Sequence, residues 1–229
     1  MILKKLLFSL GFAFCFSSIQ AQVEWESQLW TSAEIEYDFK GPWSISLSPE
    51  FRYRLQPFML RTIFPDVALA YKFNKQFSAA LHYRYQYTNE GMGNHYMVKN
   101  FLLDMMYRRK VGNWQYGLRL RGGTIEDGNP DPELLQWQSW EVREKFAVSY
   151  ELNKKYELYT TIEFFQLPVE DLFYNQQTRV SAGFEYSLSK SQKLQLGLLF
   201  QNRPDIKRLN PVCSYSLSLD ELLKKKKKK

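Results

Sequence analysis

The sequence predicts an all-β protein: an antiparallel up-and-down transmembrane β-barrel of about 10–12 strands. Three observations predict this fold. Apolar and polar side chains alternate with a period of two, the connections between the alternating runs vary in length in a regular way, and a secretory leader precedes them. After the leader, no segment approaches the roughly 18 apolar residues of a membrane-spanning helix. In lipid, only a closed sheet could then satisfy the backbone hydrogen bonds of the chain.

The first 21 residues have the pattern of a signal peptide. Lys4 and Lys5 form a charged start, an apolar core follows, and small residues precede Gln22. Cys15 lies in this leader, so the mature chain would keep Cys213 as its single thiol, which excludes an internal disulfide and a cysteine-based metal site. The expected organisation is a signal peptide over 1–21, a barrel over 22–220 and a lysine-rich tail over 221–229.

The charge of the chain is concentrated at its two ends. The formal net charge is +7, but without the six lysines at 224–229 and the two lysines of the leader the body carries −1. This balance gives no basic surface for nucleic acid, and none is expected as a partner. The high aromatic fraction of 17% suits a polypeptide placed at a membrane interface.

The clearest strand pattern lies between Asp66 and Arg121. Apolar residues of one parity alternate there with polar residues of the other in three successive runs, which is typical of strands with one apolar and one polar face. The same period recurs along most of the remaining chain, over residues 33–39, 43–54, 139–150, 156–163, 179–186, 194–201 and 215–219.

The connections between these runs alternate between short and long. Short turns are expected at 40–42, 74–76, 110–113, 151–155 and 187–192, and longer loops at 55–61, 88–94, 122–133, 166–175 and 202–210. Outer-membrane barrels have short periplasmic turns and longer extracellular loops. We count about 11 runs, whereas single-chain bacterial barrels have an even number, so residues 23–29 could add a strand and place both termini in the periplasm.

Aromatic residues gather at the ends of the runs, as expected for girdles at the two membrane interfaces. Examples are Phe39 with Trp43, Tyr71 with Phe77, and Tyr150 with Tyr156.

Charged residues of both signs share the polar parity and are predicted to line the lumen. The predicted lining residues are Arg52, Arg54, Arg84, Arg119, Arg121, Glu141, Arg143, Glu163 and Arg179. Two interpretations are open: a paired Arg–carboxylate network that fills the interior, or a polar path for a solute lined chiefly by Arg54, Arg84, Arg119 and Arg143.

A catalytic role would have to use His82 or His95, the two histidines. His82 shares the inward parity, whereas His95 stands beside a predicted loop and could meet the acidic segment 126–133, as in a hydrolase at the barrel rim. No nucleophile, base and orienting group can be placed together, so we expect no enzyme. We also expect no cofactor and no metal, because the prolines and early glycine of the acidic segment do not fit a calcium loop.

Several short stretches resemble an uncharacterised family of Bacteroidota outer-membrane proteins, the domain of unknown function 2490. They are Trp30, Arg52–Arg54, Tyr83-Arg84-Tyr85, Arg119-Leu-Arg121, Glu163-Phe-Phe and the strand carrying Arg179, Gly183 and Tyr186. The resemblance covers nearly all of the mature chain and implies an outer-membrane barrel, but no known activity.

The function expected from these observations is a structural barrel or a narrow conduit for small or amphiphilic solutes in the outer membrane of a Gram-negative bacterium. Its partners would be outer-membrane lipid, lipopolysaccharide and the barrel-assembly machinery. The alternatives are a hydrolase at the barrel rim and a soluble periplasmic β-sandwich or lipocalin-like carrier.

Overall fold

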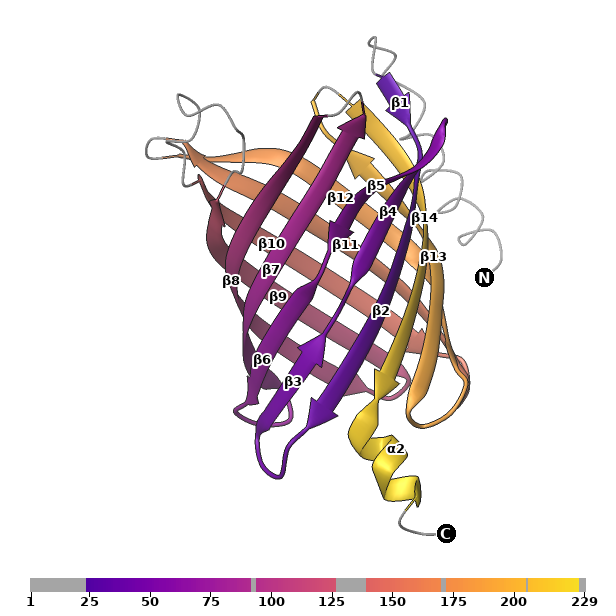
Figure 1. The fold of residues 1–229 in the computed structure, drawn as a ribbon. Coiled ribbons are helices and arrows are strands. Elements are labelled where there is room, and N and C mark those ends of the chain that lie inside the picture. Colours follow the sequence, from indigo (N-terminus) through magenta and orange to yellow (C-terminus); the bar gives the residue numbers. More distant parts are fainter. Residues whose placement is uncertain (1–23, 92–93, 127–138, 170–171, 205, 227–229) are drawn as a thin grey trace, which may run out of the picture.

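The computed structural model describes residues 24–91, 94–126, 139–169, 172–204 and 206–226, and these form a closed β-barrel (Figure 1). Eleven strands make its wall, and nearly all neighbours are antiparallel. The strands are β1 Glu24–Glu26, β2 Gln28–Asp38, β3 Trp43–Leu47, β4 Glu50–Leu55, β5 Phe58–Phe64, β6 Asp66–Lys72, β7 Phe77–Gly91, β8 Asn94–Val111, β9 Trp114–Glu126, β10 Ser139–Glu151, β11 Tyr156–Val169, β12 Leu172–Ser187, β13 Gln192–Asn202 and β14 Ile206–Ser218.

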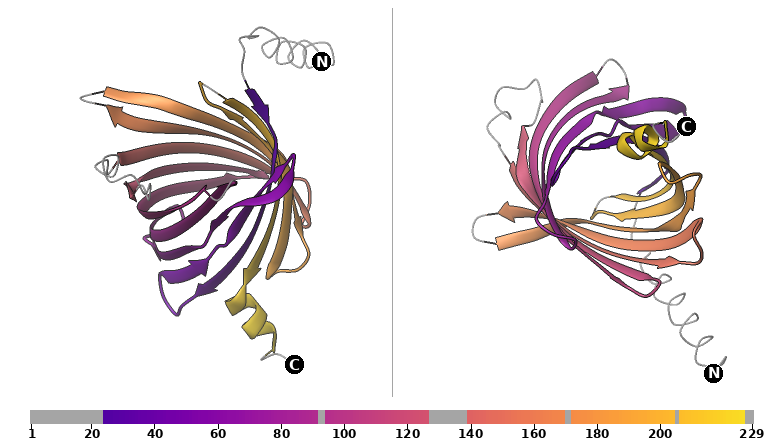
Figure 2. Two further views of the ribbon diagram at one scale, coloured as in Figure 1. Left: turned by 45° about the horizontal axis from the view of Figure 1, so that its top comes forward. Right: turned by 90° about the horizontal axis from the view of Figure 1, so that it is seen from below.

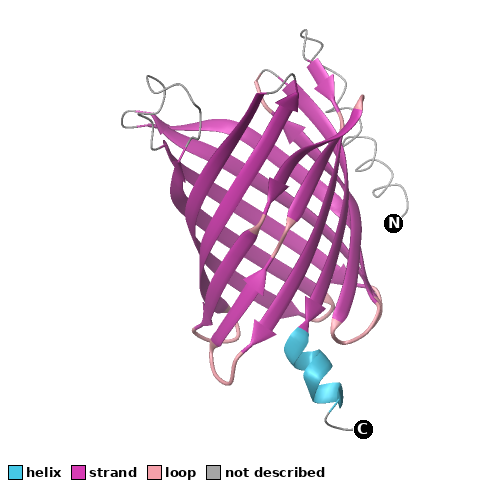
Figure 3. Ribbon diagram, in the orientation of Figure 1, coloured by secondary structure: helices cyan, strands magenta, loops and turns pink. Residues whose placement is uncertain are grey.

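Two wall strands are each interrupted by a proline. Pro49 separates β3 from β4, and Pro65 separates β5 from β6, because proline has no N–H for the ladder. Their carbonyl oxygens still accept hydrogen bonds, at 3.0 Å from the N–H of Ala33 and 3.0 Å from that of Tyr85. Each pair of segments therefore acts as one continuous stave of the wall (Figure 3).

The barrel closes through a parallel pairing of its first and last wall strands. β14 lies beside β2 from Val212 opposite Trp30 to Ser218 opposite Glu36, and the hydroxyls of Ser32 and Ser214 hydrogen bond across this seam at 2.7 Å. The view along the axis shows the resulting ring (Figure 2). A closed ring also rules out the open β-sandwich considered above.

The parallel seam corrects the expectation of an even strand number. Two neighbouring strands that run the same way require an odd count, so the described chain starts at one rim and ends at the other (Figure 1). Residues 24–29, the part of the predicted 23–29 segment that the structure describes, do not add a returning strand. β1 runs parallel to the start of β14, and Gln28 already belongs to β2.

The rim with the tight turns is called the short-turn rim, and the opposite one the long-loop rim. The five short turns lie where they were predicted, and one of them uses Gly112 at φ +60°, a conformation that favours glycine. The predicted longer loops are mostly wrong: strands continue through much of these segments, and the link from β4 to β5 is only Gln56–Pro57. The residues of these segments keep the strand period of two beyond the apolar band. Because they are polar, they were predicted to be loops.

The outer face of the wall is apolar, and an aromatic girdle surrounds it at the short-turn rim. Large apolar side chains such as Leu81, Leu103 and Phe146 point outward and are about half exposed. Aromatic rings pair across neighbouring strands near the turns, with centroids 4.8–4.9 Å apart for Trp43 with Tyr71, Phe77 with Tyr107, Trp114 with Tyr150, and Tyr156 with Tyr186. These pairs form the girdle expected at one interface.

The chain leaves the short-turn rim as a helix, α2 Leu219–Lys226. Ser218 precedes it, and Asp220 and Glu221 occupy its first turn, where acidic side chains complement the helix dipole. Leu219 therefore begins a helix and does not end the last strand as expected. No helix of the described chain has the length and apolar character needed to cross a bilayer. The predicted signal peptide lies outside the described residues.

Candidate functional site in the barrel lumen

The structure places the nine predicted lining residues on the inner face of the wall. Contacts across non-neighbouring strands demonstrate this. Arg119 of β9 donates to Glu163 of β11 at 2.5 Å, and the guanidinium of Arg179 on β12 lies 5.2 Å from the ring centroid of Trp30 on β2. Arg54 stands apart from the other eight, near the long-loop rim, where it lies 3.4 Å from Glu26.

Four of these arginines join three aromatic rings in a chain of contacts across the lumen, called here the cation–aromatic stack. Its members alternate in the order Arg84, Phe64, Arg52, Trp30, Arg179, Phe165 and Arg143. The successive distances from guanidinium carbon to ring centroid are 5.7, 4.2, 3.7, 5.2, 4.2 and 4.6 Å. Each such contact contributes up to about 2 kcal/mol where water is excluded, which favours this packed arrangement of the side chains.

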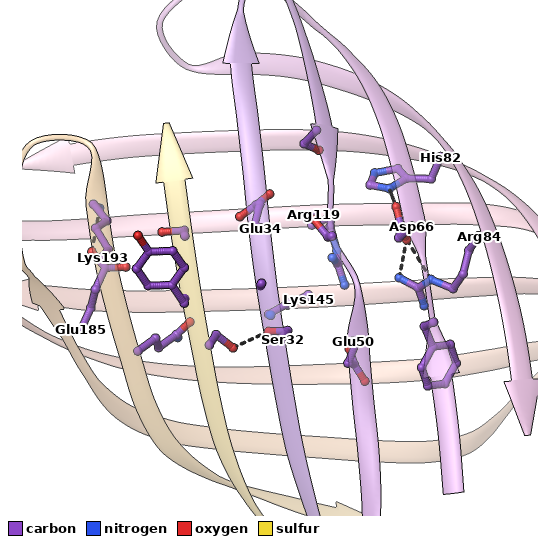
Figure 4. A pocket seen from close by; sticks show the side chains of 18 of the residues that line it. Ser32, Glu34, Glu50, Asp66, His82, Arg84, Arg119, Lys145, Glu185 and Lys193 are labelled. Carbon is purple, nitrogen blue, oxygen red and sulfur yellow. Dashed lines mark hydrogen bonds and ion pairs between the residues drawn. The ribbon is translucent and has the colours of Figure 1, made fainter. Parts of the chain in front are cut away.

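The stack lies between two groups of cavities, as the order of residues along the strands shows. On β4, Arg54 lines a cavity of about 700 Å³ at the long-loop rim, Arg52 belongs to the stack, and Glu50 lines a cavity of about 440 Å³ on the other side. Trp30 of β2 likewise separates Ser32 of the same strand from Ser27, which precedes the strand. We call these the outer chamber and the inner chamber. Figure 4 shows side chains that line the inner chamber, and a further cavity, lined by Ser44, Lys72 and Ser78 among others, continues it toward the short-turn rim.

Carboxylates hold most of the lumen arginines. Glu50 accepts from Arg52 at 2.6 Å, Asp66 from Arg84 at 2.8 Å, and Glu141 from Arg143. In the outer chamber, Glu26 lies within 3.4 Å of three guanidiniums, those of Arg54, Arg61 and Arg208.

The most buried ion pair joins Asp104 and Arg121. The side chain of Asp104 accepts from two nitrogens of Arg121 at 2.5 and 2.7 Å, and both residues are at least 95% buried. His82 extends this pair to a second carboxylate: its Nδ1 is 2.8 Å from Asp66 (Figure 4), and its Nε2 is 3.4 Å from Asp104. The imidazole is therefore held between two strands as part of the charge network.

Sequence reasoning missed the aromatic members of the stack. Trp30, Phe64 and Phe165 are buried and face the lumen, although aromatic residues were expected at the outer interfaces. A usable signal existed, because Phe165 shares its parity with Glu163, and Trp30 shares its parity with Gln28 and Ser32. Glu26, Asp66 and Arg208 were also missed.

The rim arrangement considered for a hydrolase is described only in part. The ring of His95 lies 6.0 Å from that of Tyr87, and the acidic segment it was expected to meet falls outside the described residues beyond Glu126. Among the residues that are described, no group of three or more His, Cys, Asp or Glu side chains is arranged to hold a metal ion.

A closed wall, an apolar outside and a charged, divided lumen define the class of this protein: it is a β-barrel similar to outer-membrane porins. The NanC porin supports the fold, and two further solved structures match it more weakly. The NanC porin matches with a TM-score of 0.52 at 9% identity, over 79% of this chain and 92% of that one. OmpT of Vibrio cholerae, with 11% identity and a TM-score of 0.40, matches over 70% of this chain and 54% of its own, and an anion-selective porin of Comamonas acidovorans, with 12% and 0.39, over 77% and 53%.

The family follows from the sequence itself. Residues 27–210 match the family described as "Protein of unknown function (DUF2490)", and the chain belongs to that family. This match confirms the resemblance to the domain of unknown function 2490, while the Bacteroidota origin stays an expectation. No curated protein matches the sequence.

Proposed function

We propose that the protein is a narrow conduit of the bacterial outer membrane for small polar or amphiphilic solutes, with the cation–aromatic stack as its constriction. One observation carries the proposal: open chambers of about 700 and 440 Å³ lie on opposite sides of a partition that consists only of side chains. A purely structural barrel has no need of such chambers. Side chains can shift without breaking the backbone ladder of the wall.

The outer-membrane location is supported by the distribution of apolar surface. Leucine, valine and aromatic side chains cover the outside, where a soluble carrier would present polar residues, while charges fill the inside. We expect lipid and lipopolysaccharide to surround this band and the barrel-assembly machinery to insert it. Fractionation tests this directly, since a barrel should remain with detergent-extracted membranes and migrate differently on gels before and after boiling.

The conduit is tested by conductance in planar bilayers, with Phe165→Ala as the informative variant. Phe165 contacts Arg143 and Arg179, so its removal should widen the constriction and raise single-channel conductance at least twofold. Phe146→Ala is the matched control, because Phe146 lies on the neighbouring strand, faces outward and is 47% exposed. It should leave conductance unchanged.

Two outcomes would overturn the conduit. One is the absence of ion or glycerol permeation through both the wild type and Phe165→Ala in liposomes. The other is an equal effect of the two substitutions, which would mean that the lumen is not the path.

We further propose that the barrel has no catalytic activity. His95→Ala should then leave every property of the protein unchanged, and purified barrel should release no product from phospholipid or peptide substrates. Hydrolysis that depends on His95 would reject this part of the proposal.

A further inference from the structure

One row of lumen side chains has more positive charge than its partners neutralise. The strand register places Arg119, Lys145, Glu163, Arg179 and Gln201 directly opposite one another on the five consecutive strands β9 to β13. This group, called the Glu163 row, contains three cations and one carboxylate. Its net charge is +2.

The cations of the row differ in whether they have a partner. Arg119 binds Glu163 at 2.5 Å and lies 3.8 Å from Asp104. Within the part of the chain that the structure describes, Lys145 and Arg179 have no hydrogen bond and no carboxylate within 4.0 Å. In addition, the Nε donors of Arg119 and Arg179 are buried without an acceptor.

Such an arrangement favours a bound anion. A cation withdrawn from water without a counter-ion is costly, and so is a buried donor without an acceptor. The neighbouring lumen arginines avoid both costs through Glu50, Asp66, Asp104 and Glu141. The Glu163 row lacks the equivalent carboxylates, and an oxyanion would supply them.

The row is accessible from the inner chamber. Arg119 and Lys145 line its cavity of about 440 Å³, together with the hydroxyls of Ser32, Ser46 and Ser214 (Figure 4). This volume is typical of sites for small molecules. The two cations lie on β9 and β10, and the serine hydroxyls lie opposite them on β2, β3 and β14, an arrangement across the chamber that suits a carboxylate or phosphate group of a small solute.

We propose that the inner chamber contains a binding site for small oxyanions, with Lys145 and Arg119 as its contact residues and Arg179 adding charge behind them. This inference rests on the proposed conduit. The site would select anionic solutes beside the constriction. The recognised group is a carboxylate or phosphate carried by a small solute.

Isothermal titration of the detergent-solubilised barrel tests the site, with inorganic phosphate and succinate as probes and glycerol as the neutral control. Lys145→Gln should weaken phosphate binding about tenfold, because it removes a cation that has no other partner. Glu163→Gln should tighten binding, because the row then carries +3 in place of +2. A residue with a merely structural role would not produce opposite effects of this kind.

Lys110→Gln serves as the matched control, since Lys110 is an exposed lysine paired with Glu151 at the short-turn rim. It should leave the affinity for phosphate within a factor of two. Binding of phosphate but not succinate would assign the site to phosphate, and the reverse result would assign it to carboxylates.

The site would be rejected if neither anion bound the wild type, if Lys145→Gln bound phosphate as tightly as the wild type, or if Glu163→Gln weakened binding. These results are separate from a failure of the conduit, because titration in detergent requires no permeation. Permeation without anion binding removes the site alone, and anion binding without permeation removes the conduit alone.

Discussion

Asp104 provides the most informative perturbation of the lumen network. Only 1% of its surface is exposed, and its carboxylate accepts from Arg121 at 2.5 and 2.7 Å while His82 lies 3.4 Å away. Asp104→Asn keeps the shape of the side chain but removes its charge. The guanidinium of Arg121, itself 4% exposed, then loses its only carboxylate within 4.0 Å in the described chain.

The expected loss of stability follows from this burial. Removing the charge of one member of a buried ion pair lowers the free energy of unfolding by about 3–5 kcal/mol, because the charge of the other member stays buried without a counter-ion. Urea unfolding of the barrel in lipid vesicles, followed by tryptophan fluorescence, measures this change in unfolding free energy. Glu151→Gln is the control: it breaks the exposed pair with Lys110 and should cost at most about 1 kcal/mol.

A second substitution separates pairing from packing. The double variant Asp104→Asn/Arg121→Gln also lacks the buried guanidinium that Asp104→Asn leaves without a counter-ion. It should therefore recover a large part of the unfolding free energy lost in Asp104→Asn. The reasoning fails if Asp104→Asn costs less than about 1 kcal/mol, or if the losses of the two single variants simply add.

Two further predictions concern the wall itself. Cysteines in place of Ser32 and Ser214, in a chain that also carries Cys213→Ser, should form a disulfide across the parallel seam and shift the band of the boiled, unreduced chain relative to the reduced one, whereas an even-numbered barrel would leave both thiols free. Gly183→Ala should destabilise the barrel by about 1–3 kcal/mol in the same urea assay, because a Cβ there would lie 2.6 Å from the hydroxyl of Tyr159 and 2.2 Å from a backbone carbonyl; an unchanged midpoint would contradict this packing.

The architecture could be predicted from the sequence because one rule governs it. With a side-chain period of two, the parity of a residue decides whether it faces lipid or lumen, and a single apolar run fixes the parity of its strand. Arg119 and Glu163 could thus be assigned to the interior from local sequence alone. The pairing between these two residues could not, because it depends on which strands lie two positions apart and on their register.

The odd strand number could not be read from the sequence for a different reason. Parallel and antiparallel neighbours present the same alternation, so nothing in β2 or β14 indicates that they run in the same direction. The long loops were predicted to be longer than they are for a related reason. Strands that extend past the apolar band become polar on both faces, and their sequence then resembles that of a loop. Only the ring closure, which involves the whole chain, distinguishes these cases.

The stack indicates how a solute would pass the constriction of the proposed conduit. Three of its four arginines are fixed by carboxylates on the wall: Arg52 by Glu50, Arg84 by Asp66, and Arg143 by Glu141. The fourth, Arg179, is held only by the faces of Trp30 and Phe165 within the described chain.

A passing solute therefore need not break an ion pair at Arg179. It has to displace two ring contacts there, each worth up to about 2 kcal/mol, and an anionic group can replace them at the same guanidinium. The weakest point of the partition is thus one of the two cations of the Glu163 row that have no carboxylate within 4.0 Å in the described chain, and we expect solutes to cross the stack at this point.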